Sequence, residues 1–430
     1  MKRYLLFKYL PYSILLIAIL TIQPYTTLPL IGSTFVSWFL QFILLYSFYA
    51  VIPHLKTHKK PSFAEYAVVF YILYNIISFI RGLFVAETYW DYKALFANGL
   101  ALLLPVVAFA GMNMAFVVVL LKYYLKYTLP LFIFFFPFIS SGAVGFYLVP
   151  ISFFAIFLPI IRRPWNFIVL TISLFVVFFA FGARSNVIKF FIPVLFSMFY
   201  YFRYFIGNKV LRIIRNVLFI LPFVLFLLAI SGSFNIFKIN EYIRTDAKTE
   251  STNVFTGEKS TEDLTTDTRT DIYIEVLKTA KKYNTWVFGR SPARGNETEL
   301  FSDLADITGR QERSSNEVAI LNVFMWTGLI GVFFYFIIFY FASYLALNRS
   351  NNYFSKLLGI YLAFRWCYAW VEDINFFTLT TFMLWITIGV CMSSQIRKMN
   401  NQEIILWINA IFSNKLNLKF RMYWKKKLIK

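Results

Sequence analysis

The chain has 430 residues, of which 59% are hydrophobic and only 15% are charged. Soluble domains usually carry about 25% charged residues. This composition, with a mean hydropathy of +0.64, excludes a soluble domain and indicates a polytopic membrane protein. The net charge of +21 is spread over short basic clusters between apolar runs, which is typical of cytoplasmic loops and argues against nucleic acid as a partner.

The apolar runs predict an all-α polytopic fold of about twelve transmembrane helices, with both termini in the cytoplasm. We expect spans at about residues 9–22, 34–52 and 63–80, then runs ending near 111, 139, 162, 180 and 203, and finally 216–230, 319–345, 356–371 and 376–392. Within residues 111–139, Lys122 and Lys126 lie four apart and fit one face of an interfacial helix on the cytoplasmic side.

This topology divides the chain into four parts. Residues 1–232 hold nine spans, 233–318 form one large external loop, 319–394 hold three spans, and 395–430 form a basic cytoplasmic tail. The loop contains 12 basic and 15 acidic residues, so the positive charge of the protein lies outside it. The basic clusters fall on one side of the membrane and the loop on the other, as the positive-inside rule requires.

Part of the loop has helical periodicity. In TDTRTDIYIEVLKTAKKY, the apolar residues Ile272, Val276, Ala280 and Tyr283 recur at helical spacing and predict an amphipathic helix that packs on another element. Thr268 and Asp271 have the spacing of a capping box. We therefore expect the helix to begin at this point.

Arg269 would then lie in the first helical turn, where the helix dipole disfavours a cation. A residue placed against its local preference indicates a function, and an arginine beside free backbone N–H groups suits a diphosphate. The alternative is an exposed arginine paired with Asp271 or another carboxylate of the loop.

Two further cations are expected near the external surface. Arg184, in GARSN, follows one span, and Lys189 enters the next, so together they favour an anion site. The alternative for Arg184 is an arginine that extends to a lipid headgroup.

Arg365 lies deeper, in LLGIYLAFRWCYAW, where an unpaired arginine is costly. Glu372 is seven residues ahead on the same helical face, so either the two form a structural ion pair or Arg365 faces a substrate cavity.

The end of the loop offers the remaining candidates. WVFGRSPARG combines a tight, exposed connection with Arg290 and Arg294. Asn316 and Glu317 stand where the chain re-enters the membrane. Glu317 is either a favourable carboxylate at a helix N-terminus or a general base opposite the arginines. No cluster of metal ligands is found in the external segments, so we expect neither a metal nor another cofactor.

Residues 184 to 331 resemble the superfamily of Wzy-type polysaccharide polymerases and O-antigen ligases. The resemblance rests on GARSN, on the run TRTDIYIEVLKTAKKYNTWVFGRSPARG, and on NEVAILNVFMWTGLIG with its closing G-L-I-G. It implies an enzyme of the bacterial plasma membrane whose Arg184 and Arg269 hold the diphosphate of an undecaprenyl-linked glycan, which is both donor and acceptor. A chain-length regulator and a flippase of the same pathway are further candidate partners.

One departure separates the chain from the ligase branch. The ligases carry a His-Asn pair about eleven residues before G-L-I-G, where this chain has Glu317 and Val318, and it has no external histidine. We therefore expect a polymerase in which Arg184, Arg269 and Glu317 are catalytic and Lys189, Arg290, Arg294, Asn316 and Arg365 bind substrate. The alternatives are an O-antigen ligase that transfers glycan to lipid A core, a lipid-linked glycan flippase, and a non-catalytic scaffold of an envelope assembly complex. A flippase would show internal repeats, which this sequence lacks.

Overall fold

The computed structural model describes residues 9–55, 61–179, 184–241, 248–252, 259–263, 269–299 and 308–429. The chain is mostly helical, with almost no sheet. Within these ranges, six helices are long and apolar enough to cross a membrane: Thr34–Pro53, Phe63–Val85, Tyr89–Gly111, Met114–Phe138, Asn208–Ile230 and Ala319–Asn348. Four shorter apolar helical stretches are Leu10–Tyr25, Ser141–Ala155, Trp165–Phe179 and Leu379–Met392. The predicted all-α membrane character is confirmed at this level.

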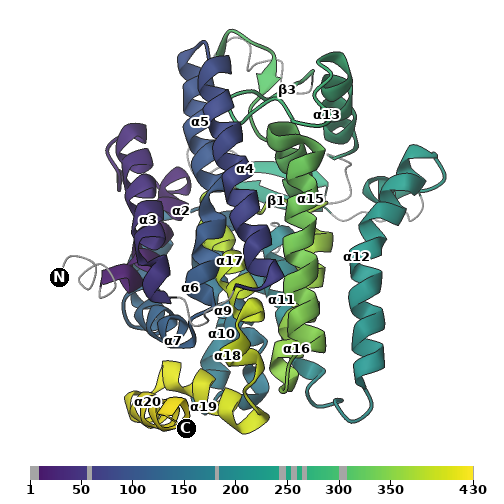
Figure 1. The fold of residues 1–430 in the computed structure, drawn as a ribbon. Helices are drawn as coiled ribbons and strands as arrows, with labels where there is room; N and C mark the ends of the chain where they lie inside the picture. Colours follow the sequence, from purple (N-terminus) through teal and green to yellow (C-terminus); the bar gives the residue numbers. More distant parts are fainter. Residues whose placement is uncertain are drawn as a thin grey trace.

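The helices follow one another with short connections up to residue 230 (Figure 1). They are α2 (Ser13–Ile22), α3 (Thr34–Leu55), α4 (Phe63–Val85), α5 (Tyr89–Leu102), α6 (Val107–Gly111), α7 (Met114–Tyr123), α8 (Leu129–Phe135), α9 (Ser141–Ala155), α10 (Trp165–Phe179), α11 (Arg184–Met198) and α12 (Asn208–Ile230). Residues 233–318, the polar segment, follow α12 in the chain. The described part of this segment contains α13 (Thr270–Lys282) and two antiparallel strand pairs, β1 (Lys248–Thr252) with β2 (Lys259–Asp263) and β3 (Asn296–Glu297) with β4 (Glu312–Arg313). The remaining helices are α15 (Ala319–Asn348), α16 (Tyr353–Tyr368), α17 (Leu379–Met392), α18 (Ser394–Arg397), α19 (Asn401–Phe412) and α20 (Asn414–Ile429).

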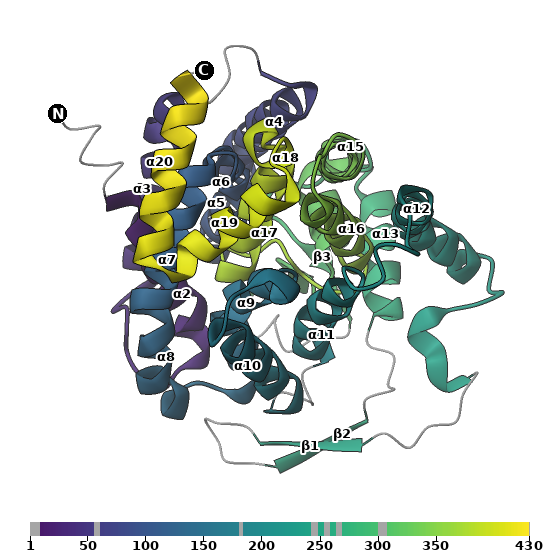
Figure 2. The ribbon, with the colours of Figure 1, turned by 90° about the horizontal axis from the view of Figure 1, so that it is seen from below.

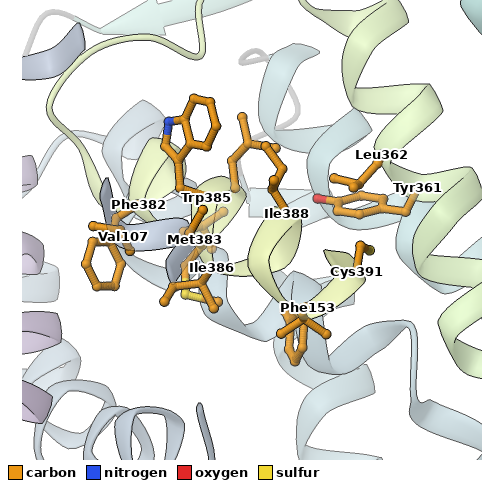
Figure 3. Packing of buried hydrophobic residues seen from close by; sticks show 14 of the residues in the cluster. Val107, Phe153, Tyr361, Leu362, Phe382, Met383, Trp385, Ile386, Ile388 and Cys391 are labelled. Carbon is orange, nitrogen blue, oxygen red and sulfur yellow. The ribbon is translucent and has the colours of Figure 1, made fainter. Parts of the chain in front are cut away.

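The centre of the bundle is α17, a helix that is apolar on every side. All 14 of its residues are buried, as expected for a helix without a polar face. Its side chains pack against α6, α9 and α16, and Figure 3 shows Phe382, Trp385 and Ile388 between Val107 and Tyr361. The other helices are arranged around this core.

The two ends of the bundle differ in composition. The upper end in Figure 1 carries α13 and β3 beside the turn between α4 and α5. At that turn Asp91 is 3.2 Å from Arg310 of the polar segment, and Asn98 donates to the backbone of the same segment at Ser314. Seen from below, α19 and α20 lie across the opposite end (Figure 2). The polar segment and the basic tail therefore lie at opposite ends of the molecule.

At the edge of the bundle, α12 is held by a buried arginine (Figure 1). Arg215 is 3% exposed, and each of its three guanidinium nitrogens donates a hydrogen bond: Nε to Ser343 Oγ, Nη2 to the Tyr340 carbonyl, and Nη1 to Asn216 Oδ1. Its guanidinium also lies 4.3 Å from the centre of the Tyr340 ring. These contacts join α12 to α15 and satisfy a charge that would otherwise be costly at this depth.

The polar segment is joined to the bundle by backbone hydrogen bonds at a break in α15. Gly328 has φ +67° inside this helix, and the break frees backbone groups that pair with residues 286–291. Arg290 N–H donates to the Met325 carbonyl at 2.6 Å, and Leu329 N–H donates to the Trp286 carbonyl at 2.9 Å. Gly289 and Gly328 therefore meet here: a Cβ on Gly289 would lie 2.6 Å from the Gly328 backbone nitrogen, and one on Gly328 would lie 2.2 Å from the Val287 carbonyl oxygen.

We expect Gly328→Ala to destabilise the protein. The alanine would have to adopt a left-handed conformation, which costs about 1–3 kcal/mol, and its Cβ would overlap the Val287 carbonyl. The thermal unfolding midpoint of the purified protein in detergent measures the effect. Gly142→Ala is the matched control, because nothing lies within 4 Å of that position. Equal midpoints for the two variants would contradict this account of the break.

Candidate functional site

The amphipathic helix predicted in the polar segment is present as α13. Ile272, Val276 and Ala280 are buried, which confirms the periodicity, whereas Tyr283 ends the helix and is 42% exposed. Its inner face docks just beyond the end of α16, where the Tyr273 hydroxyl donates to the Trp370 carbonyl at 2.7 Å. The helix begins at Thr270 with Arg269 as its N-cap residue, and Thr268 lies outside the described residues. Arg269 therefore stands just before the first turn instead of within it.

Arg269 is at the centre of a cluster of charged side chains that come from four separate stretches of the chain. Its Nη2 is 3.4 Å from a carboxylate oxygen of Glu317 and 3.9 Å from one of Glu372. The other oxygen of Glu372 lies 3.5 Å from the Lys189 ammonium, and Glu317 also lies 3.3 Å from Arg313. Arg269 thus pairs with carboxylates that are distant in sequence, and not with its neighbour Asp271. The cluster includes three of the predicted site residues: Lys189, Arg269 and Glu317.

Lys189 enters this cluster from within the bundle. Its side chain is 1% exposed, and its ammonium lies 4.6 Å from the centre of the Phe146 ring as well as beside Glu372. One turn earlier, the Ser185 carbonyl accepts a hydrogen bond from the Tyr368 hydroxyl, which places the start of α11 against the end of α16. Arg184, next to Ser185, is exposed at that same end of the bundle. Of this predicted pair, Lys189 is thus beside Glu372.

Arg365 is buried in the last turn of α16 but does not pair with Glu372, whose carboxylate faces Lys189 and Arg269 instead. It is 2% exposed, and its Nη1 lies 3.4 Å from the Tyr361 hydroxyl. Its Nε and Nη2 have no hydrogen-bond partner among the described residues. A buried guanidinium with two unused donors is unusual and indicates an anion or ordered water at this depth.

The other predicted binding residues serve the architecture of the polar segment. Arg290 and Arg294 both pair with Glu312, at 3.1 and 2.6 Å. Burial raises the pKa of Glu312, but the hydrogen bonds and charges of these two arginines outweigh it and leave the pKa below its ordinary value. Asn316 is buried, and its backbone N–H and carbonyl both bond to the Asn322 side chain. None of these three predicted residues joins the cluster around Arg269 through a contact between described side chains.

Asp373, next to Glu372, was not singled out by the sequence. Its Oδ1 accepts a hydrogen bond from the Asn375 backbone at 2.8 Å, whereas its buried Oδ2 has no partner among the described residues. Burial raises the pKa of Asp373 to about 7, against the lowering effect of the Asn375 hydrogen bond and with a further rise from the Glu372 charge. The adjacent carboxylates in WVEDIN, at the end of an apolar run, were the signal that could have identified it.

Two hollows of different character lie on either side of the cluster. An apolar hollow of about 420 Å³ lies between α12, α13 and α16 and is lined by Thr270 and Val371, whose carbonyl accepts a hydrogen bond from Arg269. A more polar hollow of about 510 Å³ is lined by Trp90, Asn98 and Arg313, the second partner of Glu317. The Arg269–Glu317 pair therefore connects an apolar space to a polar one.

Comparison with protein-family models, with curated proteins and with solved structures finds no match for this chain. Within the described ranges, no three His, Cys, Asp or Glu side chains gather as a metal site would require.

We expect Asp373→Asn to stabilise the protein in a pH-dependent way. A carboxyl whose pKa rises from 3.8 to about 7 on folding opposes folding increasingly as pH rises between these values, and by a constant amount above pH 7. The unfolding midpoint of the variant should therefore exceed that of the wild type, by a margin that grows between about pH 4 and 7 and stays level above pH 7. Each kcal/mol of difference in unfolding free energy corresponds to a shift of roughly 2–4 °C in this midpoint.

Thermal unfolding in detergent across this pH range measures the margin. Asp271→Asn, which removes an exposed carboxylate of α13, is the matched control. A margin that shrinks as pH rises would refute the assignment of a raised pKa to Asp373.

Proposed function

We propose that this protein is a polysaccharide polymerase of the bacterial plasma membrane. It transfers a growing glycan from undecaprenyl diphosphate to a sugar hydroxyl of the next lipid-linked repeat unit. The reaction takes place at the outer face of the membrane. Residues 233–318 would lie on that face if the chain has twelve spans and both termini are cytoplasmic. The proposal extends the resemblance of residues 184–331 to Wzy-type polymerases.

The observation that carries the proposal is the position of the charged cluster between the two hollows. A lipid-linked glycan has an apolar tail, a diphosphate and a polar sugar chain in that order. The apolar hollow beside Val371, the cations Arg269 and Lys189, and the polar hollow beside Arg313 follow the same order. Apolar hollows with a few convergent polar groups are the usual form of ligand sites.

The chemistry requires positive charge at the leaving group. The acceptor oxygen forms a bond to the anomeric carbon, and the bond from that carbon to the diphosphate breaks, so undecaprenyl diphosphate departs with the electron pair. Arginines stabilise this charge by bidentate hydrogen bonds without a metal. We assign this role to Arg269 and Arg184, with Lys189 and Arg365 as further cations facing the diphosphate.

The acceptor hydroxyl must also lose its proton to a base. Glu317 is the carboxylate expected from the sequence, but one of its oxygens lies 3.4 Å from Arg269 and the other 3.3 Å from Arg313. Asp373 has a free carboxylate oxygen and a pKa near neutrality, which is the better match to a general base. We therefore propose two candidates for the proton acceptor, Asp373 and Glu317.

Two alternatives use the same substrate differently. A ligase would transfer the glycan to lipid A core, and the chain lacks the external histidine of that branch. A flippase would move the lipid across the membrane, which gives no reason for 86 residues of polar chain between two spans. The polymerase accounts for both features.

We expect Arg269→Ala to abolish polymerisation, because loss of one donor to a developing oxyanion costs about 100-fold or more in rate. The measurement is the length distribution of surface polysaccharide in a strain that lacks the gene and carries wild-type or variant protein at matched membrane levels. Wild type should restore the ladder, whereas Arg269→Ala should leave a single repeat unit on the acceptor. Lys281→Ala, which removes an exposed cation of the same helix, should restore the ladder fully.

The same strain distinguishes the alternatives. Loss of all glycan from the acceptor, with lipid-linked material at the outer face, would indicate a ligase, and accumulation at the cytoplasmic face would indicate transport. An unchanged ladder without the gene would refute all three. Glu317→Gln and Asp373→Asn then identify the base, since only the variant that removes it should leave substrate bound but unreacted.

A further inference from the structure

A second group of cations lies at the opposite end of the bundle, where α7 meets α20 (Figure 2). It consists of Lys122 at the end of α7, Lys126 in a short π-helix (Tyr124–Thr128), and Arg421 in α20. Lys122 donates a hydrogen bond to Asn414 at the start of α20. Arg421 and Lys126 are the two cations whose charges act on the Lys122 ammonium. The three side chains therefore form one local concentration of positive charge.

No carboxylate among the described residues neutralises this positive charge. Among the described side chains, no carboxylate lies within ion-pair distance of Lys122, Lys126 or Arg421. Like charges held together by the fold repel one another, so the arrangement is stable only with an anion or abundant water nearby. It differs in this respect from the cluster around Arg269, in which every cation faces a carboxylate.

Aromatic rings surround the same place. The ring centres of Tyr12 and Tyr123 are 4.6 Å apart, and those of Tyr123 and Tyr127 are 5.4 Å apart. The Lys126 ammonium lies 4.8 Å from the centre of the Tyr127 ring. Tyrosines gather at the boundary between acyl chains and headgroups, and π-helical turns are frequent at functional sites. The rings beside these cations are therefore of the kind that contacts lipid headgroups.

The adjacent face of α20 is apolar and uncovered. Asn414, Leu418, Arg421 and Met422 have the spacing of one helical face. Leu418 is 62% exposed and Met422 is 61% exposed, although Phe420 and Trp424 on the inner side of the helix are buried. Exposed apolar side chains next to an uncompensated cation suit a ligand that has an acyl chain beside its anionic group, and they do not suit free phosphate.

We propose that Lys122, Lys126 and Arg421 bind the phosphate headgroup of an anionic phospholipid in the leaflet at the α20 end of the bundle. The acyl chains of this lipid would lie along Leu418 and Met422. The site is independent of the proposed polymerase activity, because it lies at the other end of the molecule and shares no residue with the cluster around Arg269.

The test uses the full-length protein in nanodiscs that contain phosphatidylglycerol and phosphatidylcholine, with native mass spectrometry of the lipids that remain bound. Wild type should retain phosphatidylglycerol preferentially. The triple variant Lys122→Gln/Lys126→Gln/Arg421→Gln should lose this preference by about 5-fold for each cation removed. The charge-conserving variant Lys122→Arg/Lys126→Arg/Arg421→Lys should keep it, which separates loss of charge from misfolding.

A matched control removes three cations elsewhere on the same end of the bundle. Lys209, Lys398 and Lys419 are exposed, and Lys419 faces away from Arg421 around α20. The triple Gln variant of these residues should retain the wild-type preference. Equal losses in the two triple variants would show a general effect of net charge and would overturn the proposal.

A second measurement distinguishes the source of the phosphate. Addition of phosphatidylglycerol to the detergent-purified protein should raise the thermal unfolding midpoint of the wild type and not that of the Lys122/Lys126/Arg421 variant. Inorganic phosphate should have no such effect. An equal rise with inorganic phosphate, or no preference for phosphatidylglycerol in the nanodiscs, would refute a lipid site.

Discussion

The position of Glu372 determines which charged side chains meet at one end of this molecule. Its carboxylate lies between Lys189 from inside the bundle and Arg269 from the polar segment, so one anion joins α11 of the bundle to the start of α13. A lysine that is 1% exposed requires such a partner, because an unpaired charge in an apolar interior is costly. The need to neutralise Lys189 therefore helps to hold α13 over the bundle, and with it the arrangement proposed as the substrate site.

Backbone pairing gives this arrangement its rigidity. Side-chain ion pairs at the surface contribute little by themselves. The hydrogen bonds between residues 286–291 and the broken start of α15 are a stronger constraint, since they form only when Gly328 takes its left-handed conformation. Together with the partly buried Arg290–Glu312–Arg294 group, they hold the polar segment against α15 and so keep Glu317 near Arg269. The arginines expected to bind substrate are thus more important here as internal supports.

The buried arginines Arg215 and Arg365 differ in how many of their guanidinium nitrogens form hydrogen bonds. Arg215 has hydrogen bonds from all three guanidinium nitrogens and a ring contact, so its role is to hold α12 against α15. Arg365 has one such bond and two unused donors. At the opposite end, Lys122, Lys126 and Arg421 lie together without a carboxylate among the described residues. In both places the uncompensated charge is the physical reason to expect a ligand, a substrate in one case and a membrane lipid in the other.

The sequence by itself determined the class of protein and the positions of its polar parts. Composition and apolar runs identify a helical membrane protein, and the spacing of Ile272, Val276 and Ala280 predicts α13, because burial of apolar surface leaves a periodic signal in the chain. Only the tertiary structure decided which charges meet. Glu372 is seven residues from Arg365, but α16 ends at Tyr368 before it, and Glu372 faces Lys189 and Arg269, which are more than 100 residues away in sequence. Helical spacing indicates only which residues share a face, whereas ion pairing depends on how separate helices pack.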